Sequence, residues 1–444
     1  MIDLCIKNCK ISTENNFCSI SIDQGKIISI GKNPSKAERT IDAEGNLVLP
    51  GLIDVHVHFR DPGLTYKEDF ESGSQAAANG GFTTILDMPN TIPPTNTAKN
   101  FQNKLQIASK KSIVDFGLHA GVSDLKEIEK IAPLNPASFK IFMDTVNSGF
   151  LNEAFKTISE ISKVENKDIN FQNNENNLSK PVITLHAEDK DIVNKCTEQL
   201  KLEKENNPSD YALARPSVAE ELAVAQAIAL THHYQTKTHF CHVSTFKSLE
   251  MINNSKSFLN NISSEITPQH LFLDSSAFKK FGNLAKTNPP LRKYSEKIPW
   301  ENLNQIDLIG TDHAPHALEE KKKDVWEASP GIPNLEVILK LLLTKYNSQK
   351  ISLESIKRLL CENPAKIFNL NNKGFIEVGM DADLVIIDLK KEGIIKSDEF
   401  YSKAHYTPFE DTKYLGAPIM TICRGNLIMD HNNVHQNQGI HVYP

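Results

Sequence analysis

The pattern of apolar and polar positions divides the chain into two β-rich ends and a long middle with alternating strand and helix patterns. Residues 1–50 contain short strand patterns, and an Asp-Gln-Gly turn at 23–25 joins two of them into a hairpin pattern. Residues 371–444 have the same character, with strand patterns at 382–389 and 419–424. The two ends therefore predict one small β-sandwich domain assembled from both termini.

The middle of the chain, residues 51–370, predicts a second structural unit in which strands alternate with helices. The expected strands are the short apolar runs at 53–58, 82–88, 113–118, 138–143, 182–187, 238–243, 262–267 and 306–311. The clearest helix pattern begins where Ser217 and Glu220 predict a capping box, and Gly80 and Gly81 predict the end of the helix after the first strand. Eight strands with intervening helices favour a closed parallel (β/α)8 TIM barrel over an open sheet.

Residues 165–180 interrupt this alternation. They are rich in Asn and show no periodicity. We expect them to form an inserted surface loop without a chemical role.

Composition and charge exclude several classes of protein. The 444 residues are 39% hydrophobic and 23% charged, with a net charge of −6 and no long basic run, so we expect no nucleic-acid or membrane partner. No apolar run approaches the roughly 18 residues of a membrane-spanning helix, and the first residues lack a signal-peptide pattern. The seven cysteines are scattered without a CxxC pair, which is typical of a reducing compartment and predicts a cytoplasmic protein.

Candidate metal ligands occur at the ends of predicted strands. His56 and His58 alternate on the first strand, so both side chains face the same side, at the strand end where barrel enzymes carry their chemistry. Two histidines on one strand face also occur by chance, but His186, His242 and Asp312 end the fifth, sixth and eighth strands in the same way. Burying so many polar groups without partners would be costly, so we interpret these five residues as metal ligands.

Lys140 is a sixth candidate, because it lies inside the fourth predicted strand between bulky apolar residues. A lysine in such a position must be exposed, paired or modified. One interpretation is a buried neutral amine that takes up carbon dioxide and becomes a carbamate bridging two metal ions. The other is an ammonium group paired with a nearby carboxylate, and the sequence fits both.

With these motifs the chain resembles the amidohydrolase superfamily, and within it the cyclic amidases, which include dihydroorotases, hydantoinases and allantoinases. The resemblance runs from Pro-Gly-Leu-Ile-Asp-Val-His-Val-His at 50–58 to Gly-Met-Asp-Ala-Asp-Leu-Val at 379–385. It implies Zn2+ as the cofactor, with two ions per chain. The implied ligands are His56, His58 and Asp312 for the first ion and His186 and His242 for the second, with carboxylated Lys140 bridging both.

A second motif favours one substrate among the cyclic amides. The string His-Val-His-Phe-Arg-Asp-Pro-Gly at 56–63 resembles dihydroorotases in particular, where the arginine binds the substrate's carboxylate, a role suited to a guanidinium. The same resemblance implies Asn90 and His316 as further carboxylate contacts and Asn288 as a contact to the polar edge of the ring. Allantoin and simple hydantoins lack this ring carboxylate. Arg60, Asn90 and His316 therefore favour dihydroorotate, with allantoinase and hydantoinase activity as the alternatives.

The resemblance implies the zinc-dependent, reversible interconversion of dihydroorotate and carbamoyl-aspartate in pyrimidine biosynthesis. Asp312 would be the catalytic proton acceptor and donor. As protein partners, a second copy of the chain in a homo-oligomer and aspartate carbamoyltransferase both stay open. An alternative from a different functional class is a non-catalytic assembly protein that keeps the barrel. Such relatives lose metal ligands, whereas the set of implied metal ligands in this chain is complete.

The other histidines and Cys241 have simpler interpretations. We expect His313 to face away from the site because it directly follows Asp312. Cys241 reads as a small core residue, with a contribution to an extra metal site as the less favoured alternative. His119, His270 and the histidines near the C-terminus are expected to be structural or exposed.

Overall fold

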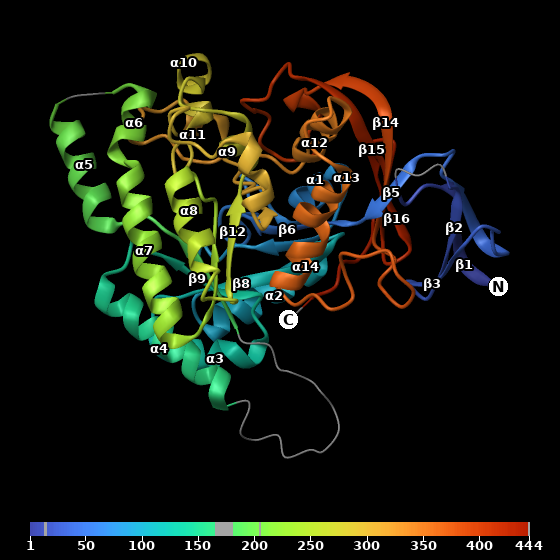
Figure 1. The fold of residues 1–444 in the computed structure, drawn as a ribbon, viewed down its shortest axis with the longest axis horizontal. Coiled ribbons are helices and arrows are strands. Elements are labelled where there is room, and N and C mark those ends of the chain that lie inside the picture. The colour runs from blue at the N-terminus through green and yellow to red at the C-terminus, as the bar shows by residue number, and fades with distance from the viewer. Residues whose placement is uncertain (13–15, 165–180, 204–205, 443–444) are drawn as a thin grey trace.

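The computed structural model describes residues 1–12, 16–164, 181–203 and 206–442, so the loop expected at 165–180 lies outside the described residues. Eight parallel strands, hydrogen-bonded in chain order, form the centre of the molecule, and helices pack around them (Figure 1). The strands are β6 (Leu52–Val57), β7 (Phe82–Asp87), β8 (Asp115–Gly121), β9 (Ser138–Phe142), β10 (Val182–His186), β11 (Lys237–Phe240), β12 (Ile262–Ile266) and β13 (Leu308–Ile309). Each overlaps one of the eight predicted strands, so the predicted TIM-type barrel is confirmed.

The first and last strands approach each other and nearly close the barrel. Val57 at the end of β6 forms a parallel bridge with His313, which follows β13. The backbone N–H of His58 donates to the carbonyl oxygen of His313 at 2.9 Å. This seam brings the strand that carries His56 and His58 beside the segment that carries Asp312.

The helices complete the barrel and connect its strands. The longer ones are α1 (Phe70–Gly80), α2 (Ala98–Lys111), α4 (Ser148–Val164), α5 (Lys190–Leu202), α7 (Ser217–Tyr234), α8 (Phe246–Ser255) and α12 (Ile338–Asn347). The shorter ones are α3 (Leu125–Ile131), α6 (Pro208–Ala214), α9 (Pro268–Phe272), α10 (Ala277–Phe281), α11 (Leu318–Lys321), α13 (Leu353–Lys357) and α14 (Asn363–Ile367). Helix α1 ends at Gly80, and Gly81 caps it in the left-handed conformation at φ 92°, as predicted.

The predicted capping box at the start of α7 is wrong. The N-cap is Pro216, and no side chain caps the helix. The Ser217 hydroxyl instead donates to Glu296 at 3.1 Å, and the Glu220 carboxylate accepts from the backbone N–H groups of Ser244 and Thr245. The two side chains that the local pattern predicted to cap the helix therefore form hydrogen bonds with residues from distant segments instead.

The two ends of the chain form two sheets that lie beside the barrel, on the right in Figure 1. One contains β1 (Ile2–Cys9), β2 (Cys18–Asp23), β3 (Lys26–Gly31) and β4 (Ala37–Asp42). The other contains β5 (Leu47–Pro50), β14 (Leu384–Ile394), β15 (Lys413–Cys423), β16 (Asn426–Asp430) and β17 (Asn433–Val434). β5 pairs antiparallel with β14, and one apolar cluster includes Ile6 and Ile22 together with Leu384 and Ile386. Pairing and burial thus join both termini, as the strand patterns predicted.

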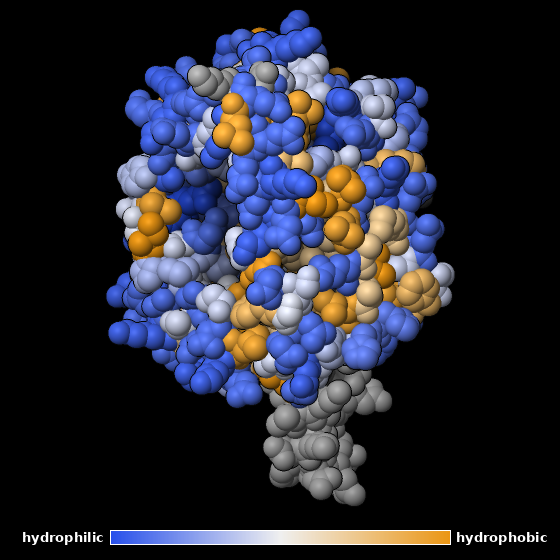
Figure 2. Space-filling view, turned by 90° about the vertical axis from the view of Figure 1, so that its left-hand side faces the viewer, coloured by the Kyte–Doolittle hydropathy of each residue, from blue (hydrophilic) through white to orange (hydrophobic). Residues whose placement is uncertain are grey.

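The outer surface on the α5 and α7 side is mostly hydrophilic, with several hydrophobic patches (Figure 2). Leu213 of α6 and Val218 and Leu222 of α7 are each about half exposed. Among the residues the structure describes, no helix combines the length and apolar character needed to cross a membrane.

Gly81 gives a test of the junction between α1, the barrel and the C-terminal sheet. A Cβ atom there would lie 3.0 Å from Cγ2 of Val385, and the positive φ disfavours any other residue. We expect Gly81→Ala to lower the free energy of unfolding by about 1–3 kcal/mol in urea denaturation followed by circular dichroism. Gly31→Ala is the matched control because a Cβ there meets nothing within 4 Å. Equal losses in both variants would contradict this account.

Candidate metal centre and active site

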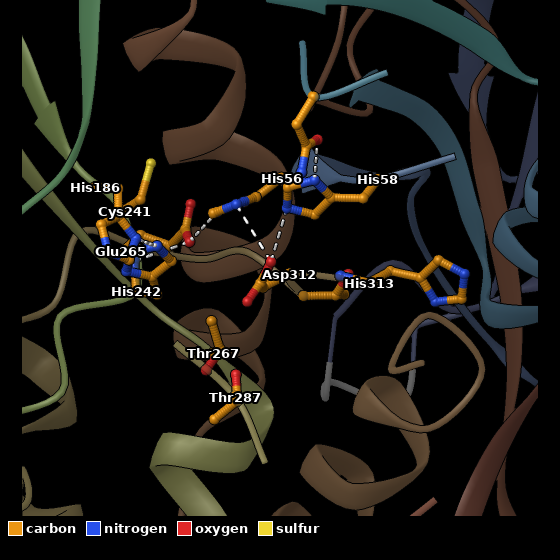
Figure 3. Close-up of polar contacts among 12 residues, drawn as sticks. His56, His58, His186, Cys241, His242, Glu265, Thr267, Thr287, Asp312 and His313 are labelled. Atoms are coloured by element: carbon orange, nitrogen blue, oxygen red, sulfur yellow. Dashed lines mark hydrogen bonds and ion pairs between the residues drawn. The ribbon is translucent and has the colours of Figure 1, made fainter. Parts of the chain in front are cut away.

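Three predicted ligands meet at the seam of the barrel. Nε2 of His58 lies 3.0 Å and Nε2 of His56 lies 3.4 Å from the same atom, Oδ1 of Asp312 (Figure 3). All three side chains are buried, and their ligand atoms lie within 4.8 Å of one another. Two imidazole nitrogens and one carboxylate oxygen are a donor set that suits zinc and similar divalent ions. This group of residues could hold a metal ion.

Buried partners fix which nitrogen of each imidazole faces Asp312. Nδ1 of His56 lies 2.7 Å from Oε1 of Glu265, and Nδ1 of His58 lies 2.6 Å from Oδ1 of Asn90. Both oxygens can accept, so each Nδ1 is placed to donate its proton to them, and the Nε2 atoms of both rings face Asp312. Metal-ligating histidines typically have this second hydrogen bond.

His186 and His242 form a second group next to the first. Nδ1 of His186 lies 3.0 Å from Nε2 of His242, and the His242 ring lies 5.3 Å from the His56 ring, centre to centre. Nε2 of His186 faces the Glu188 carboxylate at 2.9 Å, where it donates its proton. Lone pairs that face each other at this distance repel unless a proton or a metal ion lies between them. The spacing suits two metal–nitrogen bonds of about 2.0–2.1 Å to one ion.

Lys140 is buried in the middle of β9, beside both groups. Its Nζ lies 2.9 Å from Sγ of Cys241 and 5.2 Å from the centre of the Phe142 ring. Cys241 in turn groups with His56 and Glu265, whose ligand atoms are within 4.8 Å of its sulfur. Among the described residues no carboxylate oxygen lies within 4.0 Å of Nζ. The environment of Lys140 therefore differs from the simple ion pair that was one of its two interpretations.

Three site residues have a backbone conformation that is unusual for residues other than glycine. The φ angles of Arg60, His242 and Asp312 are 61°, 37° and 46°. Such positive values cost of order 1–3 kcal/mol each and concentrate at functional sites. Each residue lies just beyond a barrel strand, so the backbone turns out of the strand where its side chain joins the site.

Burial and neighbouring charges set the protonation of the site. Burial lowers the pKa of His58 to about 4 and holds that of His242 well below its usual value. Burial acts the same way on His56, but the carboxylates of Glu265 and Asp312 outweigh it and raise its pKa well above the usual value. Buried negative charge thus surrounds the His56 ring, and a bound cation would neutralise it.

A cavity of about 280 Å³ opens beside the two histidine groups. All four predicted substrate-binding residues line it, namely Arg60, Asn90, Asn288 and His316. Nη2 of Arg60 lies 3.1 Å from Nε2 of His316, and the Tyr211 hydroxyl donates to Oδ1 of Asn288 at 2.5 Å. The structure therefore brings the predicted substrate contacts and the predicted metal ligands together in one volume.

The sequence patterns did not predict several charged residues of the site. Glu265 accepts from His56 and also from the backbone N–H of His242 at 3.0 Å, so it links the two histidine groups. Arg215 lies 2.6 Å from Glu188 and 2.8 Å from Asp144, behind His186. A signal for Glu265 was present, since it is a charged residue inside an apolar strand, as Lys140 is. No local pattern points to Arg215, which lies in a connection between α6 and α7.

The remaining histidines agree with their predicted interpretations. The ring of His313 points away from Asp312 (Figure 3), and its Nε2 lies 3.5 Å from Glu68. His119 and His270 are buried, and each bonds a hydroxyl and a backbone carbonyl. None of these three contributes to the histidine groups described above.

Comparison with known proteins decides the family. The Amidohydrolase family matches residues 47–428 of this chain. A dihydroorotase from Methanothermobacter thermautotrophicus is 48% identical over 443 residues, which cover 100% of this chain and 97% of that protein. The chain belongs to the amidohydrolase family and, within it, to the dihydroorotases.

Other amidohydrolases resemble this dihydroorotase family member over its full length. An L-hydantoinase from Paenarthrobacter aurescens is 33% identical, covering 99% of this chain and 97% of that protein. The solved structure of an L-hydantoinase (dihydropyrimidinase) from Arthrobacter aurescens superposes with a TM-score of 0.92 at 32% identity and covers 100% of both chains. The fold is thus shared with hydantoinases, and choosing among the substrates of the family depends on the pocket.

Glu265 allows a test of the metal centre. We expect Glu265→Gln to weaken zinc binding about 10- to 100-fold, because the amide removes the buried negative charge that polarises His56. Zinc affinity is measured by competition with a chelator and metal analysis. Glu336→Gln is the control, since Glu336 is also buried but bonds Asn79 and the backbone of Tyr401. Unchanged zinc affinity in Glu265→Gln would show that Glu265 has no part in holding the metal.

Proposed function

We propose that this chain catalyses the reversible interconversion of (S)-dihydroorotate and N-carbamoyl-L-aspartate, a step of pyrimidine biosynthesis, with two zinc ions as cofactor. The observation that carries the choice of substrate is the state of Arg60. This guanidinium is buried in the cavity wall, and among the described residues no carboxylate lies within 4.0 Å of it. Its hydrogen-bond partners are the carbonyl oxygen of Pro315 at 3.3 Å and the His316 ring. A buried guanidinium without a carboxylate partner favours an anionic ligand.

The ring carboxylate of dihydroorotate fits this place. Arg60 and His316 would bind it, and Nδ2 of Asn90 would donate to it, because Oδ1 of Asn90 already accepts from His58. Asn288, which also lines the cavity, would contact the polar edge of the ring. Holding the ring at several points fixes the amide bond relative to the histidine groups, which is the main contribution of positioning to catalysis.

The metal ligands in this proposal are His56, His58, Lys140, His186, His242 and Asp312, with Lys140 carboxylated. When bound, divalent ions would supply Lewis-acid activation of water and of the ring's amide carbonyl. Asp312 is the residue that would move the proton. It would accept the proton of the attacking water and pass it to the ring nitrogen that leaves, and the reverse order serves ring closure.

The state of Asp312 suits the role of proton acceptor. Burial favours the protonated carboxyl, but the neighbouring His56 and His58 outweigh it and lower the pKa of Asp312. Asp312 therefore begins the reaction as a carboxylate that can accept a proton. His58, held neutral by burial, does not compete for that proton.

Hydantoinase activity is the second candidate, favoured by the full-length similarity to an L-hydantoinase. A hydantoin ring has no carboxylate for Arg60, so binding it would leave a buried cation unpaired, which is costly. Allantoin also lacks this ring carboxylate, so allantoinase activity is disfavoured for the same reason. A non-catalytic assembly role is disfavoured because every predicted metal ligand lies in one site.

Association with other chains and a cytoplasmic location also belong to this proposal. The half-exposed Leu213, Val218 and Leu222 give a surface on which a second copy or aspartate carbamoyltransferase could dock. All seven cysteines are free thiols, which is consistent with a reducing compartment.

A panel of substrates tests the proposed activity. We expect zinc-loaded protein to turn over dihydroorotate and carbamoyl-aspartate far faster than hydantoin or allantoin. In Arg60→Ala the KM for dihydroorotate should rise about 10- to 100-fold, because a charge-assisted hydrogen bond is lost. Arg358→Ala is the control, since Arg358 also donates to a backbone carbonyl but lies outside the cavity. Unaltered dihydroorotate kinetics in Arg60→Ala would refute the substrate assignment.

Metal content tests the role of Lys140. Wild-type protein should bind about two zinc ions per chain, and Lys140→Ala should lose metal in elemental analysis. Wild-type protein exchanged into 13C-labelled bicarbonate should gain one carbamate carbon signal that Lys140→Ala lacks. Full zinc content in Lys140→Ala, without a carbamate signal in the wild type, would exclude the bridging carbamate.

A further inference from the structure

We propose that Lys67 is a positioning residue for carboxylate recognition, because it holds His316 in the tautomer whose Nε2–H points toward the substrate cavity. This inference rests on the proposed function, in which His316 binds the substrate's carboxylate. Lys67 itself does not line the cavity, so it would act only through His316.

The Lys67 side chain is buried behind His316. Its Nζ lies 3.2 Å from Nδ1 of His316 and 3.0 Å from Oε1 of Glu320. Glu320 also accepts from the Tyr66 hydroxyl at 3.0 Å, which fixes the carboxylate in place. The ion pair with Glu320 keeps Lys67 an ammonium group, and an ammonium group only donates hydrogen bonds.

Two contacts together favour one tautomer of His316. The ammonium of Lys67 can only donate to Nδ1, and the carbonyl oxygen of Pro330 can only accept from Nε2, so these two contacts outweigh the single contact of Arg60 with Nε2 and place the ring proton on Nε2. Nε2 then donates to the carbonyl oxygen of Pro330 at 3.0 Å. Burial and the cations Arg60 and Lys67 hold the pKa of His316 well below its usual value, so the ring stays neutral and the tautomer matters.

The tautomer sets what the cavity offers to an anion. With the proton on Nε2, His316 and Arg60 both present donors, and since Nη2 of Arg60 lies 3.1 Å from Nε2, an anion beside them can accept from both. In the other tautomer Nδ1–H would turn to Oε2 of Glu320, 3.5 Å away, and Nε2 would accept from Arg60. The cavity would then lose one donor, and His316 would occupy the guanidinium that the carboxylate needs. Lys67 thus favours the arrangement that binds an anion.

The experiment compares Lys67→Met and Lys67→Arg with the wild type. We expect Lys67→Met to raise the KM for dihydroorotate at least about tenfold while kcat changes less than about threefold, since only carboxylate binding is affected. Lys67→Arg should restore most of the binding because arginine also only donates. The control is Lys403→Met, which removes a lysine paired with Asp69 near the same loop but not in contact with His316.

A spectroscopic measurement on the wild type keeps the inference testable if Lys67→Met does not fold. Nitrogen-15 NMR of histidine-labelled protein, with His316 assigned by substitution, should report a proton on Nε2 and none on Nδ1. A proton on Nδ1 in the wild type would overturn the inference, as would an unchanged KM in folded Lys67→Met. Wild-type protein that does not turn over dihydroorotate would instead overturn the proposed function, and the tautomer of His316 would still decide the role of Lys67.

Discussion

Buried carboxylates packed against imidazole rings are the constraint on which the rest of this site depends. Glu265 and Asp312 are both withdrawn from water, and both lie beside His56. Burying negative charge is costly unless a cation compensates it, and a single proton on His56 does so for only one carboxylate. His186 and His242 add two nitrogens that face each other at 3.0 Å. A cation bound between these donors would compensate the buried negative charge.

The barrel supplies the geometry that this constraint requires. Parallel strands deliver their carboxyl ends to one rim, and the seam between Val57 and His313 places the first and last strands side by side. The positive φ angles at His242 and Asp312 show that the backbone accepts local strain to aim these side chains. The surrounding core holds that strain, because a packed interior does not relax around two residues. The strained backbone at these two residues therefore lowers the stability of the fold, and in return it positions the side chains of the site.

The substrate side of the cavity follows a complementary electrostatic logic. The metal side is rich in carboxylates, whereas Arg60 and Lys67 place positive charge around the neutral His316. A ligand with a carboxylate at one end and a polarisable amide at the other matches both sides. In the proposed function, this division of charge would let a barrel shared with hydantoinases select a ring that carries a carboxylate.

The sequence by itself determined the order of the strands, the barrel, and the histidines and aspartate at the strand ends, because periodicity and strand-end position are local properties. It also placed Arg60, Asn90, Asn288 and His316, through motifs next to those strands. Only the tertiary structure decided the partners of these residues. Glu265, Arg215 and Lys67 come from separate segments, and the Ser217 and Glu220 side chains left their predicted cap for distant partners. Charged groups in a buried site choose partners by distance in space, which no local pattern encodes.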